Sequence, residues 1–385
     1  MEPETKNLID QKKYDKKQSE KKYDKKQNEP FFNEKIKTYF AFFSYTKLGI
    51  FNVGIILISI IIILIRRTNI SIFKSNKNEN IIKDLNYYQK KQNYFCDNIR
   101  YEFNKEIEET ISLFNVSLNG TNFELFLYKD LDYLSNIIRA KKFYDDVGTL
   151  HMLKALEYYK DKNNYKNEDL IIIDIGANIG WYTIFFGIHN YSVLSFEPYP
   201  ENYYVLKKNY CRNIKNIIEE NTNNLTITLI NRAIYPTEAT CGYYQDIKNS
   251  KKDLVICDLR KEDNFNIDYM KMDLVNSTNL GDFIPIINHK KIALLRLDLE
   301  FEGENAIKSG IKLITKYHIP YIFIEFNFLI FSIHMTTAQE FFQFFIDNGY
   351  KISLNGFLTN DFIDIDELMI IRATRINLYF VYVGQ

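Results

Sequence analysis

Residues 170–183 read LIIIDIGANIGWYT, and this stretch decides the fold of the chain. The four apolar residues 170–173 are typical of a strand that is buried on both faces of a sheet. Asp174, Gly176 and Gly180 then form a loop, and a helix follows. Glycine lets the backbone turn sharply and approach a ligand that a Cβ atom would block. A strand, a glycine loop and a helix in this order predict a ligand site at the helix N-terminus.

Beyond this stretch, short apolar strands alternate with helical segments. The pattern predicts strands at 170–173, 191–196, 226–231, 292–298, 320–326, 350–354 and 377–383. Helices are predicted between them, at 181–187, 201–212, 305–317 and 337–348. The alternation predicts an α/β fold with a mostly parallel seven-stranded sheet and helices on both faces. In such a sheet, ligands bind where the strands end and the following loops begin.

The spacing of the loop indicates which kind of ligand it binds. The loop has the pattern G-x-x-x-G after an acid, whereas a dinucleotide fingerprint needs G-x-G-x-x-G. We expect Asp174 to accept a hydrogen bond from an α-amino group, and the amides near Gly176–Gly180 to bind the matching carboxylate. Glu197 follows Asp174 by 23 residues at the end of the next strand, where an acid can accept both ribose hydroxyls. Helix capping by Asp174 and a solvated Glu197 are the alternatives; the two acids in this order and spacing favour a ligand site.

These residues resemble the FkbM-type family of S-adenosylmethionine-dependent methyltransferases. The resemblance covers 170–383 and is carried by 171–183, 196–202 and 206–209, with weaker matches at 231–234 and 294–300. It implies a Rossmann-like class I methyltransferase fold, S-adenosylmethionine as cofactor, and transfer of a methyl group, usually to oxygen. The cofactor-binding residues expected from the loop and the resemblance are Asp174, Gly176, Ala177, Asn178, Gly180, Glu197, Asn231 and Ala233.

Carboxylates gather where the fourth and fifth predicted strands end. Residues 298–304 read DLEFEGE, and Glu325 ends the fifth strand. Methyl transfer requires a base that takes the proton of the acceptor, and we expect Asp298, Glu300 and Glu325 to be the catalytic residues. A divalent cation bound by paired acids, or an acidic first turn of a helix, are the alternatives. The family usually shows D-x-E-G-x-E here, so this chain has one residue inserted, and Phe301 stands where the glycine belongs.

The N-terminal part has a different character. Residues 48–65 contain no charge, and 18 residues of helix span about 27 Å, close to the hydrocarbon thickness of a bilayer. We therefore expect a single transmembrane helix at 48–65, in preference to a buried core helix or a cleaved signal peptide. The expected domains are a disordered, basic-leaning tail (1–47), this helix (48–65), a stem (66–110), an N-terminal cap (111–169) and a methyltransferase domain (170–385).

The side of the membrane stays open at this stage. Within 20 residues of the predicted span there are three basic residues before it and five after it, yet the whole tail holds twelve. The positive-inside rule therefore gives two answers. Sequons for N-linked glycosylation occur at Asn69, Asn115, Asn119, Asn190, Asn224 and Asn276, but so asparagine-rich a chain yields several by chance.

Composition limits the remaining classes. The 385 residues carry 49 basic and 49 acidic side chains, which argues against a nucleic-acid-binding surface over the whole protein. The four cysteines form no C-x-x-C pair, so we expect buried thiols and no zinc site. The favoured function is an O-methyltransferase that acts on a glycan, a lipid-linked or another small hydroxyl acceptor near a membrane. An inactive binding module with the same fold is the alternative, and the missing middle glycine argues against a nicotinamide-dependent oxidoreductase.

Overall fold

The computed structural model describes ten ranges of the chain: 90–98, 104–129, 132–220, 225–246, 253–257, 269–287, 290–298, 303–328, 338–371 and 375–384. The predicted tail, the predicted span at 48–65 and residues 66–89 of the predicted stem lie outside them. Among the helices within these ranges, none combines the length and the apolar character that a membrane crossing requires.

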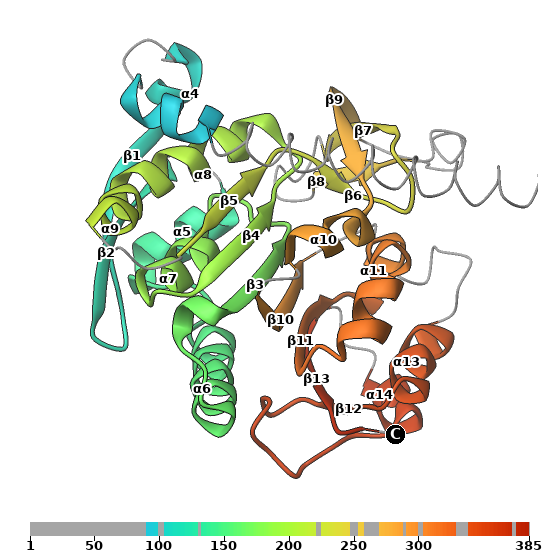
Figure 1. The fold of residues 1–385 in the computed structure, drawn as a ribbon. Coiled ribbons are helices and arrows are strands. Elements are labelled where there is room, and N and C mark those ends of the chain that lie inside the picture. Colours follow the sequence, from blue (N-terminus) through green and yellow to red (C-terminus); the bar gives the residue numbers. More distant parts are fainter. Residues whose placement is uncertain are drawn as a thin grey trace, which may run out of the picture. The chain divides into compact units, whose positions relative to one another are not determined.

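A seven-stranded sheet forms the centre of the domain, in the order β12-β13-β11-β10-β3-β4-β5 (Figure 1). Strand β13 runs antiparallel to its neighbours β11 and β12, and the other neighbouring pairs are parallel. The predicted α/β fold with a mostly parallel seven-stranded sheet is confirmed, and every predicted strand is present. The strands are β3 (Leu170–Ile175), β4 (Ser192–Phe196), β5 (Ile227–Ile230), β10 (Lys291–Asp298), β11 (Tyr321–Phe326), β12 (Tyr350–Ser353) and β13 (Ile376–Tyr382).

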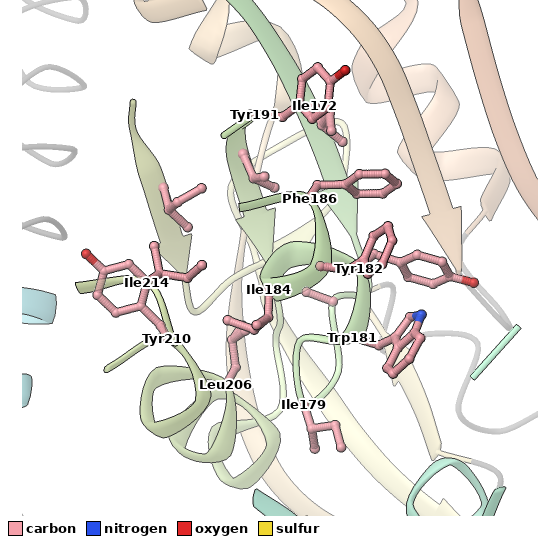
Figure 2. Packing of buried hydrophobic residues seen from close by; sticks show 14 of the residues in the cluster. Ile172, Ile179, Trp181, Tyr182, Ile184, Phe186, Tyr191, Leu206, Tyr210 and Ile214 are labelled. Atoms are coloured by element: carbon pink, nitrogen blue, oxygen red, sulfur yellow. The ribbon is translucent and has the colours of Figure 1, made fainter. Parts of the chain in front are cut away.

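Helices cover both faces of this sheet because its strands are apolar on both sides. In β3, Ile172 belongs to one hydrophobic core, whereas Ile171 and Ile173 belong to a second core on the other face. The first core includes side chains of α6 (Asp146–Asn163), α7 (Trp181–Ile188) and α8 (Pro200–Asn213). The second includes those of α10 (Ile284–Ile287), α11 (Gly303–Tyr317), α13 (Ala338–Asp347) and α14 (Ile365–Ile371). Figure 2 shows part of the first core, with Ile184 of α7 beside Leu206 of α8.

The segment before the sheet forms a cap that packs on α8. It contains α4 (Lys105–Thr110), the antiparallel hairpin of β1 (Ile111–Leu118) and β2 (Thr121–Tyr128), α5 (Tyr133–Lys141) and α6. The buried Asn209 of α8 connects this cap to the glycine loop. Its Oδ1 accepts from the Phe126 amide of β2 at 2.6 Å, and its Nδ2 donates to the Ile179 carbonyl at 2.8 Å. The cap is therefore hydrogen-bonded to the loop that follows β3. A short 3-10 helix, Asn167–Asp169, leads into β3.

A second, four-stranded sheet was not predicted from the sequence. Its order is β6-β9-β7-β8, and its strands are β6 (Ala233–Ile234), β7 (Thr240–Asp246), β8 (Asp253–Ile256) and β9 (Tyr269–Thr278). It follows β5 directly, and a 3-10 helix (Leu280–Phe283) returns the chain to the main sheet. The ring of Tyr243 in β7 stacks on that of Tyr199, which follows β4, with centroids 3.9 Å apart. The small sheet therefore lies beside the carboxyl end of β4.

All four cysteines are paired, as Cys96–Cys211 and Cys241–Cys257. The expectation of buried thiols is wrong. The first bond joins the helical segment 90–97 to α8, and the second joins β7 to the residue after β8. Cysteines 115 and 16 residues apart give no recognisable spacing, because only the fold brings each pair together.

Candidate active site

Five of the predicted site residues meet at one edge of the main sheet. Asp174, Asp298 and Glu325 lie at or near the carboxyl ends of β3, β10 and β11, and Glu197 and Asn231 follow β4 and β5 directly. This arrangement follows from the parallel strands, whose carboxyl ends share an edge. Asp298 and Glu325 are register partners across β10 and β11. Glu300, the third predicted catalytic residue, lies outside the described ranges.

The amides of the glycine loop are occupied within the protein. The amides of Gly176 and Ala177 both donate to the Phe196 carbonyl at 3.0 Å, and that of Gly180 donates to the Ala177 carbonyl at 2.9 Å. The Asn178 amide donates to the Glu197 carboxylate at 2.7 Å, and the Ile179 amide to the Asn178 side chain at 2.7 Å. We expected these amides to bind a ligand carboxylate. In this structure the amides of Gly176, Ala177 and Asn178 attach the loop to the end of β4.

Glu197 is the acceptor that organises this loop. Its Oε2 accepts from the Asn178 amide, and its Oε1 accepts from the Tyr199 amide at 2.9 Å. Asn231 fixes the backbone here, because its Nδ2 donates to the carbonyls of Glu197 and Pro198 at 2.8 and 2.9 Å. Glu197 therefore has a fixed position at the end of β4.

Two predicted cofactor residues are mostly packing positions. Ala177 is 3% exposed and belongs to the core between the sheet and α7. Ala233 is 6% exposed and belongs to the small core under the second sheet. Both side chains therefore contribute to hydrophobic cores.

Both glycines of the loop are required by space as well as by conformation. Gly176 has φ +78°, and a Cβ atom there would lie 2.2 Å from the backbone oxygen of Asp298. Gly180 has φ +97°, and a Cβ atom there would lie 2.4 Å from Cδ1 of Leu206 in α8. Gly176 thus lets β3 and β10 end side by side, and Gly180 lets α8 pack against the start of α7.

Arg296 is the centre of the polar contacts at this edge. It lies within β10 and is 2% exposed. One guanidinium nitrogen, Nη1, contacts Asp174 Oδ1 at 3.2 Å and donates to the Gly176 carbonyl at 2.8 Å. The other, Nη2, donates to Asp298 Oδ2 at 2.8 Å and to Glu325 Oε1 at 2.7 Å. One buried cation therefore connects three predicted site carboxylates with the glycine loop.

The remaining contacts of this group come from α7 and from the segment before β13. The guanidinium carbon of Arg296 lies 4.3 Å from the centre of the Tyr182 ring, close enough for a cation–π interaction. Thr183 donates to Asp174 Oδ2 at 2.6 Å. Arg375 binds Glu325 Oε2, and its Nη2 lies 3.6 Å from Asp298 Oδ1. Asp174 therefore has partners within the protein on both oxygens.

Burial and like charge shift the proton affinity of these acids. Burial, together with the neighbouring charge of Asp298, raises the pKa of Glu325 to about 7, although Arg296 and Arg375 oppose the shift. Burial also raises the pKa of Asp174, against the effect of Arg296 and Thr183. Three carboxylates share two guanidinium groups, so the group of five would carry one negative charge if every acid were ionised. A carboxyl with a pKa near neutrality can take and release a proton under physiological conditions.

Sequence reasoning missed Arg296, although the sequence contained a signal. Residues 292–298 read IALLRLD, with one cation in a strand that is otherwise apolar and buried on both faces. A buried cation needs a carboxylate partner. The predicted acids at the same edge supplied three.

A hollow of about 700 Å³ lies elsewhere on the domain. It is lined by the β1–β2 hairpin, Lys142 and the ends of α7 and α8, including Ile188, Arg212 and Asn213. It contains none of the predicted cofactor or catalytic residues. The chemistry at the strand ends and this hollow are therefore separate features.

Part of the chain matches the model of a known protein family. Residues 174–352 match the family model of the methyltransferase FkbM domain, which confirms the resemblance seen in the sequence. A solved FkbM methyltransferase from Methylobacillus flagellatus KT is 13% identical with a TM-score of 0.34, covering 65% of this chain and 61% of that one. Magnesium protoporphyrin IX methyltransferase (ChlM) from Synechocystis PCC 6803, solved with bound SAM, is 10% identical with a TM-score of 0.32, covering 66% of this chain and 85% of that one. No curated protein matches the chain significantly in sequence.

Proposed function

The chain carries a methyltransferase FkbM domain over residues 174–352, and on that premise we propose that it is an S-adenosylmethionine-dependent O-methyltransferase. The acceptor class we propose is a hydroxyl group on a glycan, a lipid-linked molecule or another small molecule. The observation that carries the proposal is the cluster of buried carboxylates around Arg296 at the same sheet edge as the glycine loop and Glu197.

The side chains at this edge suit the cofactor by their chemistry. Glu197 is held by two amides and Asn231 at the end of β4, and its carboxylate can accept from the two hydroxyls of a ribose. The first three amides of α7 have no acceptor within their own helix, so they are candidate donors for a carboxylate. When bound, S-adenosylmethionine supplies an electrophilic methyl group on a sulfonium.

The acids near Arg296 supply the base that an alcohol acceptor requires. Glu325, with its pKa raised to about 7, takes the proton of the acceptor hydroxyl in our proposal, and Asp298 lies beside it. Asp174 takes a different role from the one expected from the sequence. Its carboxylate holds Arg296 and Thr183, so we propose that it positions the loop and the cation.

Calorimetric titration with S-adenosylmethionine and its demethylated product tests the cofactor. We expect saturable binding that Glu197→Ala abolishes and that Asp174→Ala weakens strongly. Glu106→Gln, an exposed glutamate on α4, is the control and should bind as the wild type does. The site assignment fails if both site variants bind as the wild type does, and the cofactor assignment fails if the folded wild type gives no heat.

The methylated atom requires a second measurement. We propose to incubate the full chain with methyl-labelled S-adenosylmethionine and a lipid and glycan extract of the cells that produce the protein. A methyl ether survives mild alkali, whereas a methyl ester releases labelled methanol. Label released as methanol contradicts O-methylation of an alcohol, whereas label that survives alkali and is then released as methyl iodide by hydriodic acid supports it.

Two further parts of the proposal rest on the sequence. We propose residues 48–65 as a single membrane anchor, since 18 uncharged and mostly apolar residues match the bilayer thickness. The alternative function is an inactive binding module at a membrane, which the extra residue in 298–304 favours. Cofactor binding without transfer of label to any fraction of the extract would select that alternative.

A further inference from the structure

All four cysteines of the chain form disulfides, and this indicates that the protein folds in an oxidising compartment. Cys96–Cys211 closes a separation of 115 residues, and Cys241–Cys257 one of 16. Disulfides persist in secreted proteins and in the secretory lumen, whereas thiols stay reduced in the cytosol. In Cys96–Cys211, the two cysteines lie on helical segments that are far apart in the sequence. In Cys241–Cys257, they lie on or next to the paired strands β7 and β8.

Exposed sequons provide a second observation that does not depend on the cysteines. Four of the six sequon asparagines fall in the described ranges, at Asn115, Asn119, Asn190 and Asn276, and all four are exposed. None of the four side chains has a hydrogen-bonding partner among the described residues. Burial would exclude a glycan at any of them, as it does for an asparagine such as Asn209, which is fully buried.

We propose that residues 90–385 fold in an oxidising, glycosylating compartment and that Asn119 carries an N-linked glycan. Asn119 occupies the turn between β1 and β2 with φ +50°, and Gly120 follows with φ +82° and no atom near the position of a Cβ. Leu118 pairs with Thr121, so Asn119 and Gly120 form a two-residue turn, for which Asn-Gly is a preferred sequence. Asn119 is therefore an exposed attachment point at the tip of a hairpin.

The covalent steps balance with donors of known chemical class. Each disulfide forms when two thiols lose two protons and two electrons to the disulfide of an oxidised dithiol carrier, which becomes a dithiol. The glycan attaches when a bond forms between Nδ2 of Asn119 and the anomeric carbon of a polyprenyl-diphosphate-linked oligosaccharide. The anomeric carbon–oxygen bond breaks, the amide loses one proton, and polyprenyl diphosphate leaves.

The proposal assigns a side of the membrane to the domain, which the distribution of basic residues alone did not decide. With a span at 48–65, a luminal domain places the tail with its twelve basic residues in the cytosol. That is the orientation that the positive-inside rule gives when the whole tail is counted. The inference does not rest on methyl transfer, and it stands or falls independently of the enzymatic proposal.

The test is the mobility of the full chain, expressed in eukaryotic cells, before and after treatment with peptide-N-glycosidase. We expect the wild type to migrate faster after treatment. Asn119→Gln and Thr121→Ala should each reduce the mobility shift by the contribution of one glycan, because both destroy the same sequon. Thr121→Ser keeps the sequon, and Asn122→Gln changes an exposed asparagine of the same hairpin that is not in a sequon. Both variants should show the full mobility shift of the wild type.

Each other result contradicts part of the proposal. A wild-type chain whose mobility the glycosidase does not change overturns the assignment of the compartment. A wild-type shift that Asn119→Gln leaves complete overturns the assignment of Asn119. Glycan transfer occurs on the nascent chain, so a variant that folds poorly still reports its occupied sites. In a separate arm, a maleimide reagent should label the denatured protein only after reduction, and labelling without reductant overturns the two disulfides.

Discussion

Asp174 and Arg296 are register partners on the adjacent parallel strands β3 and β10, and their side chains form an ion pair with 3.2 Å between Oδ1 and Nη1. The two side chains are 1% and 3% exposed. The carboxylates of Asp298 and Glu325 bind the same guanidinium, so three acids surround the charge of Arg296. The stability of the sheet edge and its chemistry therefore depend on this one cation.

Replacing Arg296 with methionine should destabilise the domain strongly. Removing one partner of a buried ion pair costs about 3–5 kcal/mol, because the remaining charge stays buried without compensation. Arg212→Met is the matched control. Arg212 pairs with Glu124 at the surface, where an ion pair contributes only about 0–1 kcal/mol. Urea unfolding of the two variants measures the difference, and equal losses would contradict the central role of Arg296.

The pH dependence of activity should report Glu325. If this residue is the base, kcat/KM rises with pH through a pKa of about 7, since only the ionised carboxylate accepts a proton. Glu325→Gln should remove this rise together with most of the activity, whereas Glu106→Gln should leave the profile unchanged. A rise that persists in Glu325→Gln would assign it to another group.

The same pKa shift has a consequence for stability, with the opposite sign. The folded state holds the proton of Glu325 more tightly than the unfolded state, where the ordinary value is 4.5. Its contribution to stability is therefore complete below 4.5 and is lost as the pH rises through about 7. Urea unfolding between about pH 5 and about pH 8 should show a steeper loss of stability for the wild type than for Glu325→Gln. Parallel curves would contradict the shift.

Alanine at Gly180 should cost more than alanine at Gly120. Both glycines have positive φ, so both substitutions strain the backbone by about 1–3 kcal/mol. Only the Cβ at position 180 meets another atom, Cδ1 of Leu206, so the Leu206 side chain or α8 must also shift there. Thermal unfolding measures the difference, and Gly180→Ala should additionally weaken cofactor binding. Equal melting temperatures would show that α8 adjusts without cost.

The two disulfides should contribute unequally. By loop entropy, a bond that closes 115 residues stabilises by about 5 kcal/mol and one that closes 16 residues by about 3 kcal/mol. The pair of variants is Cys96→Ser with Cys211→Ser, and Cys241→Ser with Cys257→Ser. Denaturant unfolding should show the larger loss for the first, and the reverse order would mean that strain or residual structure outweighs loop length.

The main sheet could be predicted because its strands are short, continuous and apolar. Residues 170–173 and 320–326, for example, lie within two residues of the observed strands β3 and β11. Strand β1 was missed because its exposed residues include Leu113, which breaks the alternation of apolar and polar positions. The strands β7 and β9 were missed because polar residues interrupt their apolar ones, so neither has the continuous apolar run of the main-sheet strands.

The site could be located from the sequence, but its contacts could not be assigned. The positions of Asp174, Glu197, Asp298 and Glu325 follow from the strand ends, which the apolar pattern marks. Which groups occupy each carboxylate depends on register between strands, and Arg296 faces Asp174 only because β10 lies next to β3. The pattern of residues along the sequence does not show which strands are neighbours in the sheet.

The antiparallel strand β13 determines when the sheet can be completed during translation. It lies between β11 and β12, and β12 has no other neighbour in the sheet. A ribosome that has translated as far as residue 353 has produced β12 but not the strand that connects it to the rest. Until translation has passed residue 382, this edge of the nascent domain exposes unpaired backbone, which is a natural substrate for chaperones. A premature stop that removes β13 would leave β12 without its partner as well, so the loss of the last ten residues, 376–385, would cost two strands.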